Sequence, residues 1–266
     1  MIPVIHILNR DVSVYALLAG VGAVVAVFLI PALGKKRGAN YMRTQMMLLF
    51  AGLGALIGGH ILYGITNMKE LIRFIKELGS IGSFREFYTR LSLIFGGAVF
   101  YGGLILAIAV GAIYLAITEK KRDKGGYYDL GAVAIPLFHG FGRIGCFLAG
   151  CCYGVESKIG FVYHNSLAEG ANGVCRFPVQ LVEAGLNFAL FFVLLSLFGR
   201  KKLEGKLMGL YFVTYPVYRF VLEFFRGDVY RGFVGPFSTS QIISIALFIV
   251  GVVLLARKRK PKTEEE

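Results

Sequence analysis

Two arginines of this sequence lie inside long apolar segments, where a positive charge is costly. Arg143 belongs to a glycine- and cysteine-rich stretch, 142–154, and Arg219 belongs to an aromatic stretch, 215–226. A charge at membrane depth costs at least about 2.5 kcal/mol on insertion scales, so such a residue usually faces a cavity, a partner or a substrate. Because the planar guanidinium matches phosphate oxygens, the two residues predict an anionic ligand that enters from the lipid, with phosphate as the leading candidate.

The composition is that of an integral membrane protein. Of 266 residues, 56% are hydrophobic and only 17% are charged, whereas soluble domains average about 25% charged residues. Apolar segments of spanning length occur at roughly 12–33, 45–66, 91–117, 129–152, 178–198, 207–225 and 237–256. We therefore predict an all-α fold of seven transmembrane helices in one polytopic membrane domain, residues 1–266.

The fourth of these segments is the least regular in sequence. It contains Gly140, Gly142, Gly145 and Gly150, and glycine is a poor helix former. Irregular backbone at membrane depth is tolerated only against protein or a cavity. We therefore expect a broken helix that forms a wall of the site near Arg143.

Basic residues outside the apolar segments concentrate in alternate connectors. The richest are the connectors around 34–43, 118–128 and 199–206 and the C-terminal tail. The positive-inside rule then places the N-terminus outside and the C-terminus in the cytoplasm, and an odd number of spans agrees. The net charge of +13 is spread over these connectors and forms no single face, so we exclude nucleic acid as a partner.

Two polar insertions interrupt the predicted membrane domain on its outer side. Residues 67–90 carry Leu71, Ile72, Ile75 and Leu78 at helical spacing among charged residues, which predicts an amphipathic arm. Such an arm lies on the membrane surface or on a partner, or it is a solvated connector helix. Residues 153–177 are polar and contain glycine, and we expect them to form a small outer head.

Cys146, Cys151 and Cys152 follow one another closely, and Cys175 precedes the fifth apolar segment. Three interpretations stay open. The cysteines are small buried apolar side chains, or Cys175 forms a disulfide with Cys151 or Cys152 in an oxidising compartment, or the group is a metal site or a catalytic thiol. No nearby histidine completes a standard zinc spacing, and because the two arginines carry the charge role, we predict that the reaction requires no metal and no cofactor.

Two further groups of residues are candidates for chemistry. Tyr101 lies between paired glycines, and Gly102 and Gly103 would let a helix or a ligand approach the backbone closely. His139 lies one helical turn before Arg143, so the two side chains are expected to share a face. Tight helix packing is the alternative for the glycines, and a structural hydrogen bond is the alternative for His139.

Two acidic residues inside apolar segments need partners. Glu183 follows the motif that opens the fifth segment, and Glu223 lies four residues after Arg219 and three before Arg226. Ion pairs with these carboxylates would make the arginines structural. The charges balance in number, so only geometry distinguishes an anion site from buried ion pairs.

The sequence resembles the prolipoprotein diacylglyceryl transferase family. Four motifs carry the resemblance in chain order: Gly142-Arg143-Ile144-Gly145, residues 176–183, Tyr215 to Arg226 with Arg219 and Glu223, and residues 235–242. The resemblance implies an enzyme of the bacterial inner membrane whose active site lies toward the outer face. It implies transfer of the diacylglyceryl group of phosphatidylglycerol to the lipobox cysteine of a prolipoprotein signal peptide, with glycerol phosphate as the leaving group.

The resemblance also implies residue roles. Arg143 and Arg219 would stabilise the phosphate as charge develops on the leaving group, and we place Tyr101 and His139 with them as catalytic candidates. The expected substrate-binding residues are Tyr215, Gly102, Gly103, Gly142, Cys146, Glu183, Glu223 and Arg226.

The sequence departs from the family pattern at residues expected to activate the thiol of the acceptor cysteine. Tyr101 stands where the family has a histidine, Cys146 where it has an asparagine, and Cys151 near where it has a glutamate. With an ordinary pKa of about 10, tyrosine is a poor base at neutral pH, so we hypothesise that His139 compensates. The alternatives are a related phosphatidylglycerol-dependent transferase with another acceptor, or a non-catalytic anionic-lipid-binding protein. The second alternative predicts that Arg143 and Arg219 pair with the buried carboxylates.

Overall fold

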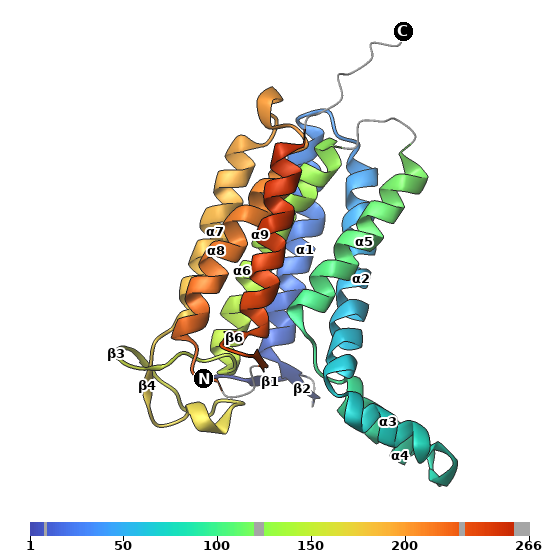
Figure 1. Cartoon of the computed structure of the whole chain (residues 1–266), viewed down its shortest axis with the longest axis vertical. Helices are drawn as coiled ribbons and strands as arrows, with labels where there is room; N and C mark the ends of the chain where they lie inside the picture. Colours follow the sequence, from blue (N-terminus) through green and yellow to red (C-terminus); the bar gives the residue numbers. More distant parts are fainter. Residues whose placement is uncertain (8–9, 120–124, 229–231, 258–266) are drawn as a thin grey trace. The chain divides into compact units, whose positions relative to one another are not determined.

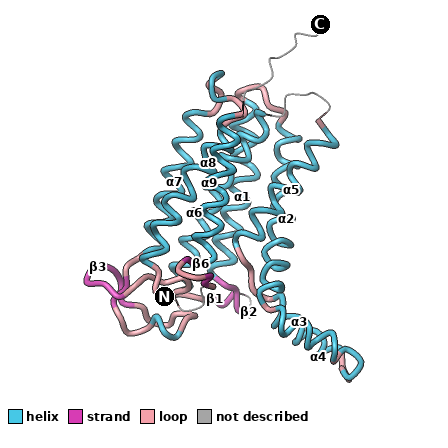
Figure 2. Tube along the Cα trace, viewed as in Figure 1, coloured by secondary structure: helices cyan, strands magenta, loops and turns pink. Residues whose placement is uncertain are grey.

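The protein is mostly helical. A computed structural model describes residues 1–7, 10–119, 125–228 and 232–257 (Figures 1 and 2). The chain separates into two compact units, Met1–Ala39 with Gly125–Glu266, and Asn40–Lys124. The first unit contains Arg143, Arg219, Glu183 and Glu223.

Within the described residues, six helices are long and apolar enough to cross a membrane. They are α1 (Val14–Lys35), α2 (Tyr41–Thr66), α5 (Phe100–Thr118), α6 (Gly125–Ala149), α7 (Val179–Leu197) and α9 (Thr239–Ala256). The sixth predicted span, 207–225, forms α8 (Leu207–Leu222), a helix of 16 residues that continues as a 3-10 turn over Glu223–Phe225. The sequence therefore predicted the helices in the right order, and six of the seven expected spans meet the length criterion.

The third predicted span, 91–117, is wrong in its first turns. The helix α4 (Phe84–Phe95) ends before Gly96 and Gly97, and α5 begins only at Phe100. The paired glycines have low helix propensity, and the apolar residues on both sides hid the break between the two helices.

The expected broken helix near Arg143 is also wrong, because α6 runs without interruption from Gly125 to Ala149. Its glycines are sites of close packing. A Cβ on Gly140 would lie 2.8 Å from the Phe188 ring, and one on Gly145 would lie 3.1 Å from Tyr15 Cα. Small residues let neighbouring helices approach, so packing stabilises a helix that propensity disfavours.

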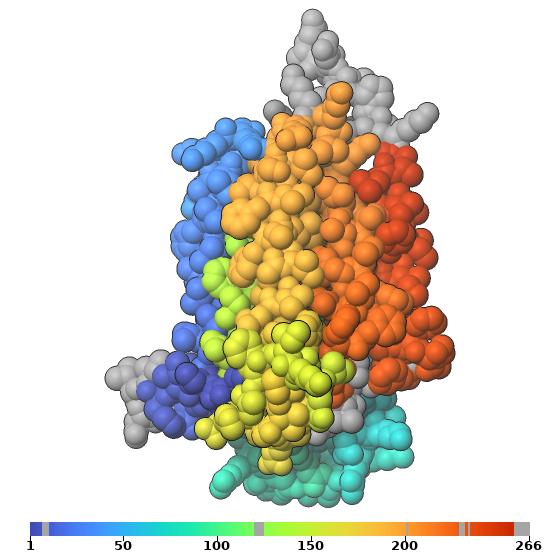
Figure 3. All heavy atoms as spheres, turned by 90° about the vertical axis from the view of Figure 1, so that its left-hand side faces the viewer, coloured from blue at the N-terminus to red at the C-terminus, as the bar shows by residue number. Residues whose placement is uncertain are grey.

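The first unit is a bundle in which α1 packs on α6, α6 on α7 and α8 on α9 (Figures 1 and 3). A buried carboxylate fixes where α8 begins. Asp129 on α6 accepts hydrogen bonds from the backbone N–H groups of Gly205 (2.6 Å) and Leu207 (2.9 Å). This contact satisfies donors at the N-terminus of α8 and sets that helix against α6.

The polar insertion before α7 forms a small head with short antiparallel strands, β3 (Glu156–Val162) and β4 (Cys175–Arg176). Other strand pairs are β1 (Val4–Ile7) with β2 (Arg10–Ser13), and β5 (Phe233–Val234) with β6 (Phe237–Ser238). Arg176 is buried and donates to the carbonyls of Gly170 (2.6 Å) and Ala171 (3.2 Å). Its guanidinium also lies 4.5 Å from the Tyr153 ring centroid, so this residue holds the head together.

In the second unit, α2 packs along α5, and the helices α3 (Met68–Lys76) and α4 form a hairpin beyond the end of α2 (Figure 1). The amphipathic arm expected at 67–90 is thus helical, but it consists of two helices. Some of its apolar side chains are exposed, with Phe84 82% and Leu93 72% exposed, whereas Phe74 is buried.

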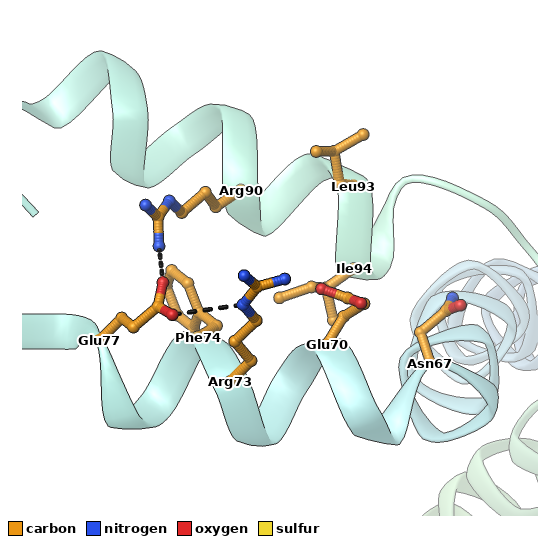
Figure 4. Close-up of a pocket in the computed structure, with 8 residues that line it drawn as sticks. All are labelled: Asn67, Glu70, Arg73, Phe74, Glu77, Arg90, Leu93 and Ile94. Atoms are coloured by element: carbon orange, nitrogen blue, oxygen red, sulfur yellow. Dashed lines mark hydrogen bonds and ion pairs between the residues drawn. The ribbon is translucent and has the colours of Figure 1, made fainter.

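Glu77 joins the two helices of the arm. Its carboxylate accepts from Arg90 Nη1 (2.6 Å) and from Arg73 Nε (3.2 Å), as Figure 4 shows for the cavity beside them. The hydrogen bonds from Arg90 and then Arg73 hold the pKa of Glu77 below its ordinary value. Arg73, Glu77 and Arg90 are therefore occupied with one another, and we assign the cavity no ligand.

Candidate active site

Glu183 is the centre of a buried cluster of charges in the first unit. This residue of α7 is 1% exposed. Its Oε2 lies 3.0 Å from Arg143 Nε, and its Oε1 lies 3.9 Å from Arg219 Nε. His139 Nε2 lies 3.7 Å from Oε1. One carboxylate therefore brings together side chains from α6 and α8 that the sequence placed far apart.

A second carboxylate extends the cluster along α8. Arg219 Nη2 lies 2.8 Å from Glu223 Oε2, and Arg226 Nη1 lies 4.0 Å from the same oxygen. Arg226 also donates through Nε to Asp228 (2.8 Å). Three guanidiniums thus face three carboxylates, so the cluster is close to neutral and its burial costs less than that of separate charges.

These contacts do not use all the guanidinium nitrogens of Arg143 and Arg219. Among the described residues, the one ion pair of Arg143 is made through Nε. Arg219 uses Nε for Glu183 and Nη2 for Glu223 and Ser240 (Oγ at 3.1 Å), while its buried Nη1 has no hydrogen-bond partner in the described parts of the chain. A buried donor without a partner costs free energy, so Arg219 Nη1 is suited to receive an anion, and no ion pair of the described residues occupies the terminal nitrogens of Arg143.

Aromatic rings surround the charges on one side. The Tyr215 ring on α8 lies 5.4 Å from the His139 ring, stacks on Tyr211 and meets Tyr218 edge to face at 5.3 Å. The Tyr218 hydroxyl donates to Asn187 Oδ1 (3.1 Å) on α7. The rings exclude water from the cluster, and the lower local dielectric strengthens its interactions with a bound anion.

The structure brings together most of the residues proposed from the sequence, and it adds others. His139, Arg143, Glu183, Tyr215, Arg219, Glu223 and Arg226 belong to one cluster. Asn187 and Ser240 were missed. Asn187 lies one helical turn after Glu183, so its spacing could have predicted that the two share a helix face. Nothing in the sequence indicates that Ser240 contacts Arg219.

Gly142 and Cys146 lie on α6 on either side of Arg143. A Cβ on Gly142 would meet no atom within 4 Å, so this glycine leaves open space on the helix and its assignment to substrate binding stays a prediction. Cys146 is buried, and its thiol lies in a group with those of Cys151 and Cys152.

Tyr101, Gly102 and Gly103 belong to the second unit, in the first turn of α5. All three are buried, and the two glycines pack against α2. A Cβ on Gly102 would lie 2.3 Å from the Gly58 carbonyl oxygen, and one on Gly103 would lie 2.8 Å from that of Ala55. The close approach of two helices accounts for both glycines, while a direct role of Tyr101 in the reaction stays a prediction.

We expect Gly102→Ala to destabilise the second unit. The new methyl group would overlap Gly58 O, which is backbone and cannot rotate away, and overpacking of this kind typically costs about 1–3 kcal/mol. Thermal unfolding in detergent micelles measures the loss. Gly52→Ala is the matched control because a Cβ there meets no atom within 4 Å, and an equal loss in both variants would contradict the packing role.

Comparisons with known proteins agree over nearly the whole chain. A family model described as prolipoprotein diacylglyceryl transferase matches residues 3–257. The phosphatidylglycerol–prolipoprotein diacylglyceryl transferase of Clostridium tetani is 35% identical over 243 residues, 90% of this chain and 90% of that protein. Phosphatidylglycerol–prolipoprotein diacylglyceryl transferase 2 of Clostridium perfringens is 37% identical over 255 residues, 94% of this chain and 92% of that protein.

A more distant relative covers as much of the chain. The phosphatidylglycerol–prolipoprotein diacylglyceryl transferase of Geobacter sulfurreducens is 29% identical over 254 residues, 92% of this chain and 91% of that protein. The resemblance noted from four motifs is therefore confirmed along the full length, and the chain belongs to the prolipoprotein diacylglyceryl transferase family.

Proposed function

We propose that this transferase moves the diacylglyceryl group of phosphatidylglycerol to the sulfur of a lipobox cysteine in a prolipoprotein and releases glycerol phosphate. Family membership and the names of the relatives support the reaction. The observation that carries it in this chain is the arrangement of Arg143 and Arg219. Glu183 holds both through Nε, and terminal nitrogens of both are left for a phosphate.

The reaction is a displacement at carbon. Phosphatidylglycerol enters from the lipid, and its phosphodiester lies between the guanidiniums of Arg143 and Arg219. The acceptor sulfur attacks the glyceryl carbon, the carbon–oxygen bond breaks, and its electron pair goes to the phosphate. Because the phosphate gains one negative charge in this step, the preorganised guanidiniums bind the transition state more strongly than the substrate.

The ion pairs of the two arginines also fit the alternative of a protein that binds anionic lipid without chemistry. A purely structural cluster would, however, use the terminal nitrogens as well as Nε, since buried donors without partners are costly. Arg219 Nη1 is such a donor in the described part of the chain. This asymmetry, together with family membership, favours the transferase.

We further propose the membrane arrangement expected from the sequence. The helix α8 and its 3-10 continuation run from Leu207 to Phe225 and would serve as the seventh span. Basic connectors favour an outer N-terminus and a cytoplasmic C-terminus in the bacterial inner membrane. Within this arrangement the two units act as one membrane domain, with membrane lipid and the prolipoprotein signal peptide as partners and no nucleic acid.

We propose His139 as the group that takes up the acceptor proton. Its Nε2 lies 3.7 Å from Glu183 Oε1 and belongs to the same buried cluster as Arg143 and Arg219. We expect His139→Ala to lower kcat by about 100-fold, the lower end of the usual range for general acid–base catalysis, while the affinity for phosphatidylglycerol changes little. His164→Ala, in the exposed part of the head, is the control, and full activity of His139→Ala in single-turnover transfer would remove this role.

A transfer assay tests the proposed function. Membranes from a strain depleted of its own transferase receive this chain, labelled phosphatidylglycerol and a lipobox peptide. We expect label on the peptide cysteine with the wild-type chain and none with Arg143→Ala or with a peptide whose cysteine is serine. Absence of label with folded wild-type protein would favour another acceptor or lipid binding without transfer.

A further inference from the structure

Three cysteine sulfurs form a compact group next to the arginine cluster. The Sγ atoms of Cys146, Cys151 and Cys152 all lie within 4.8 Å of one another. A zinc–thiolate bond of about 2.3 Å places sulfurs around one ion about 4 Å apart. Cys146 is buried, while Cys151 and Cys152 are partly exposed. The group therefore has the spacing for one metal ion and is open on one side.

The backbone that presents these sulfurs is fixed at several points. The N–H of Cys151 donates to the Cys146 carbonyl (3.1 Å), and Gln180 Nε2 donates to the Cys151 carbonyl (2.7 Å). Gly150 has a φ of +75°, and Cys152 has a φ of 53°, a conformation that non-glycine residues seldom adopt. The turn after α6 thus has an unusual backbone conformation, which places the sulfurs of Cys151 and Cys152 next to that of Cys146.

The surrounding charge suits bound thiolates. Arg143 interacts electrostatically with all three thiol groups, and Arg226 interacts with that of Cys152. A Zn²⁺ ion with three thiolates carries a net charge of −1, which positive neighbours stabilise. Soft thiolate ligands select ions such as Zn²⁺ over Mg²⁺ or Ca²⁺.

We propose that Cys146, Cys151 and Cys152 bind one Zn²⁺ ion and that its fourth coordination position takes the sulfur of the acceptor cysteine. This inference rests on the proposed transferase function. Zinc sites with three protein ligands keep an open position for a substrate, and a coordinated thiol is bound as its thiolate. Metal binding thus supplies the nucleophile that Tyr101 is poorly suited to generate.

The geometry places the two halves of the reaction side by side. Arg143 and Cys146 are three residues apart on α6, which puts their side chains on neighbouring positions of one helix face. The phosphate would lie at Arg143 and Arg219, and the acceptor sulfur at the metal, so the glyceryl carbon lies between nucleophile and leaving group.

The step balances in atoms and charge. The acceptor thiol loses its proton on coordination, and the proton passes by way of water to His139, two turns before Cys146 on α6. The metal-bound sulfur then forms a bond to the glyceryl carbon as the carbon–oxygen bond breaks. The thioether product is a neutral and weaker ligand, so it leaves the metal, and glycerol phosphate carries away the additional negative charge.

Cadmium binding tests the metal site independently of activity. Full-length protein is purified in detergent with a reductant and titrated with Cd²⁺, whose thiolate complexes absorb in the ultraviolet. We expect one Cd²⁺ per chain, an affinity at least tenfold lower in Cys146→Ser, Cys151→Ser and Cys152→Ser, and no change in Cys175→Ser, since Cys175 lies outside the group. Cys151→His keeps a ligand, so it should retain binding and guards against loss by misfolding.

A second titration tests the acceptor position. Adding a lipobox peptide to the cadmium-loaded protein should increase the thiolate band, and the same peptide with serine in place of cysteine should not. Equal Cd²⁺ affinity of the Cys152→Ser and wild-type chains would overturn the metal site. A thiolate absorbance that does not change when the cysteine peptide is added would overturn the acceptor role. Loss of lipid transfer with both cadmium results intact would instead contradict the transferase function.

Discussion

Replacing Arg219 with lysine is expected to lower kcat/KM for diacylglyceryl transfer by about 100-fold or more, the scale seen when one preorganised donor to a developing oxyanion is removed. Arg219 reaches Glu183 through Nε and Glu223 and Ser240 through Nη2, which leaves Nη1 for the substrate. A lysine ammonium is one point charge. It cannot hold these contacts and a phosphate oxygen at the same time.

The measurement is a transfer assay with purified variants at several phosphatidylglycerol concentrations, which separates kcat from KM. Arg143→Lys should show a loss of the same order, because the same carboxylate holds its Nε. Arg200→Lys, in an exposed connector, should behave as the wild type. Activity of Arg219→Lys within a factor of three of the wild type would contradict the role of the guanidinium fork.

Removing Glu183 is expected to have the largest effect on stability. Glu183 is 1% exposed and contacts both Arg143 and Arg219. Glu183→Ala would leave two buried guanidiniums short of a counter-charge, and loss of one partner of a buried ion pair typically costs about 3–5 kcal/mol. Equilibrium unfolding in mixed micelles, followed by circular dichroism, measures the change, with Glu169→Ala in the exposed part of the head as control.

A double variant separates charge from packing. If the cost of Glu183→Leu comes from an uncompensated charge, Arg143→Leu in the same chain should recover part of the lost stability. Additive losses from the two substitutions would mean that Glu183 acts through shape alone. Neither chain should transfer lipid, because each lacks a residue that positions the phosphate.

The sequence predicted the helices well because burial in lipid demands long apolar segments, and these are visible in composition. The same reasoning singled out Arg143, Glu183 and Arg219 as charges in apolar surroundings, and the structure brings them together, while their roles in the reaction stay predictions. It left the partners open: Glu183 could have paired with Arg143 or Arg219, and Glu223 with Arg219 or Arg226. The pairing depends on how α6, α7 and α8 rotate against one another, which side-chain packing decides and periodicity does not show.

Two errors in the predicted helices concern glycine. Glycine was expected to break the helix around Gly140 and Gly145, where α6 is continuous, and it was overlooked at Gly96 and Gly97, where the chain does leave the helix. In the first case, Phe188 and Tyr15 occupy the space that side chains would have filled. A single sequence does not reveal whether side chains of a neighbouring helix will fill the space beside a glycine.

The carboxylate of Glu183 also bears on how this protein enters the membrane during synthesis. The helix α6 carries Arg143, and α7, the next span along the chain, carries Glu183. Either charge alone costs roughly 2.5–3.5 kcal/mol at the centre of an inserted helix. We expect α6 to be retained at the insertion machinery until α7 is made, so that the two helices pass into the lipid together with Arg143 and Glu183 already paired.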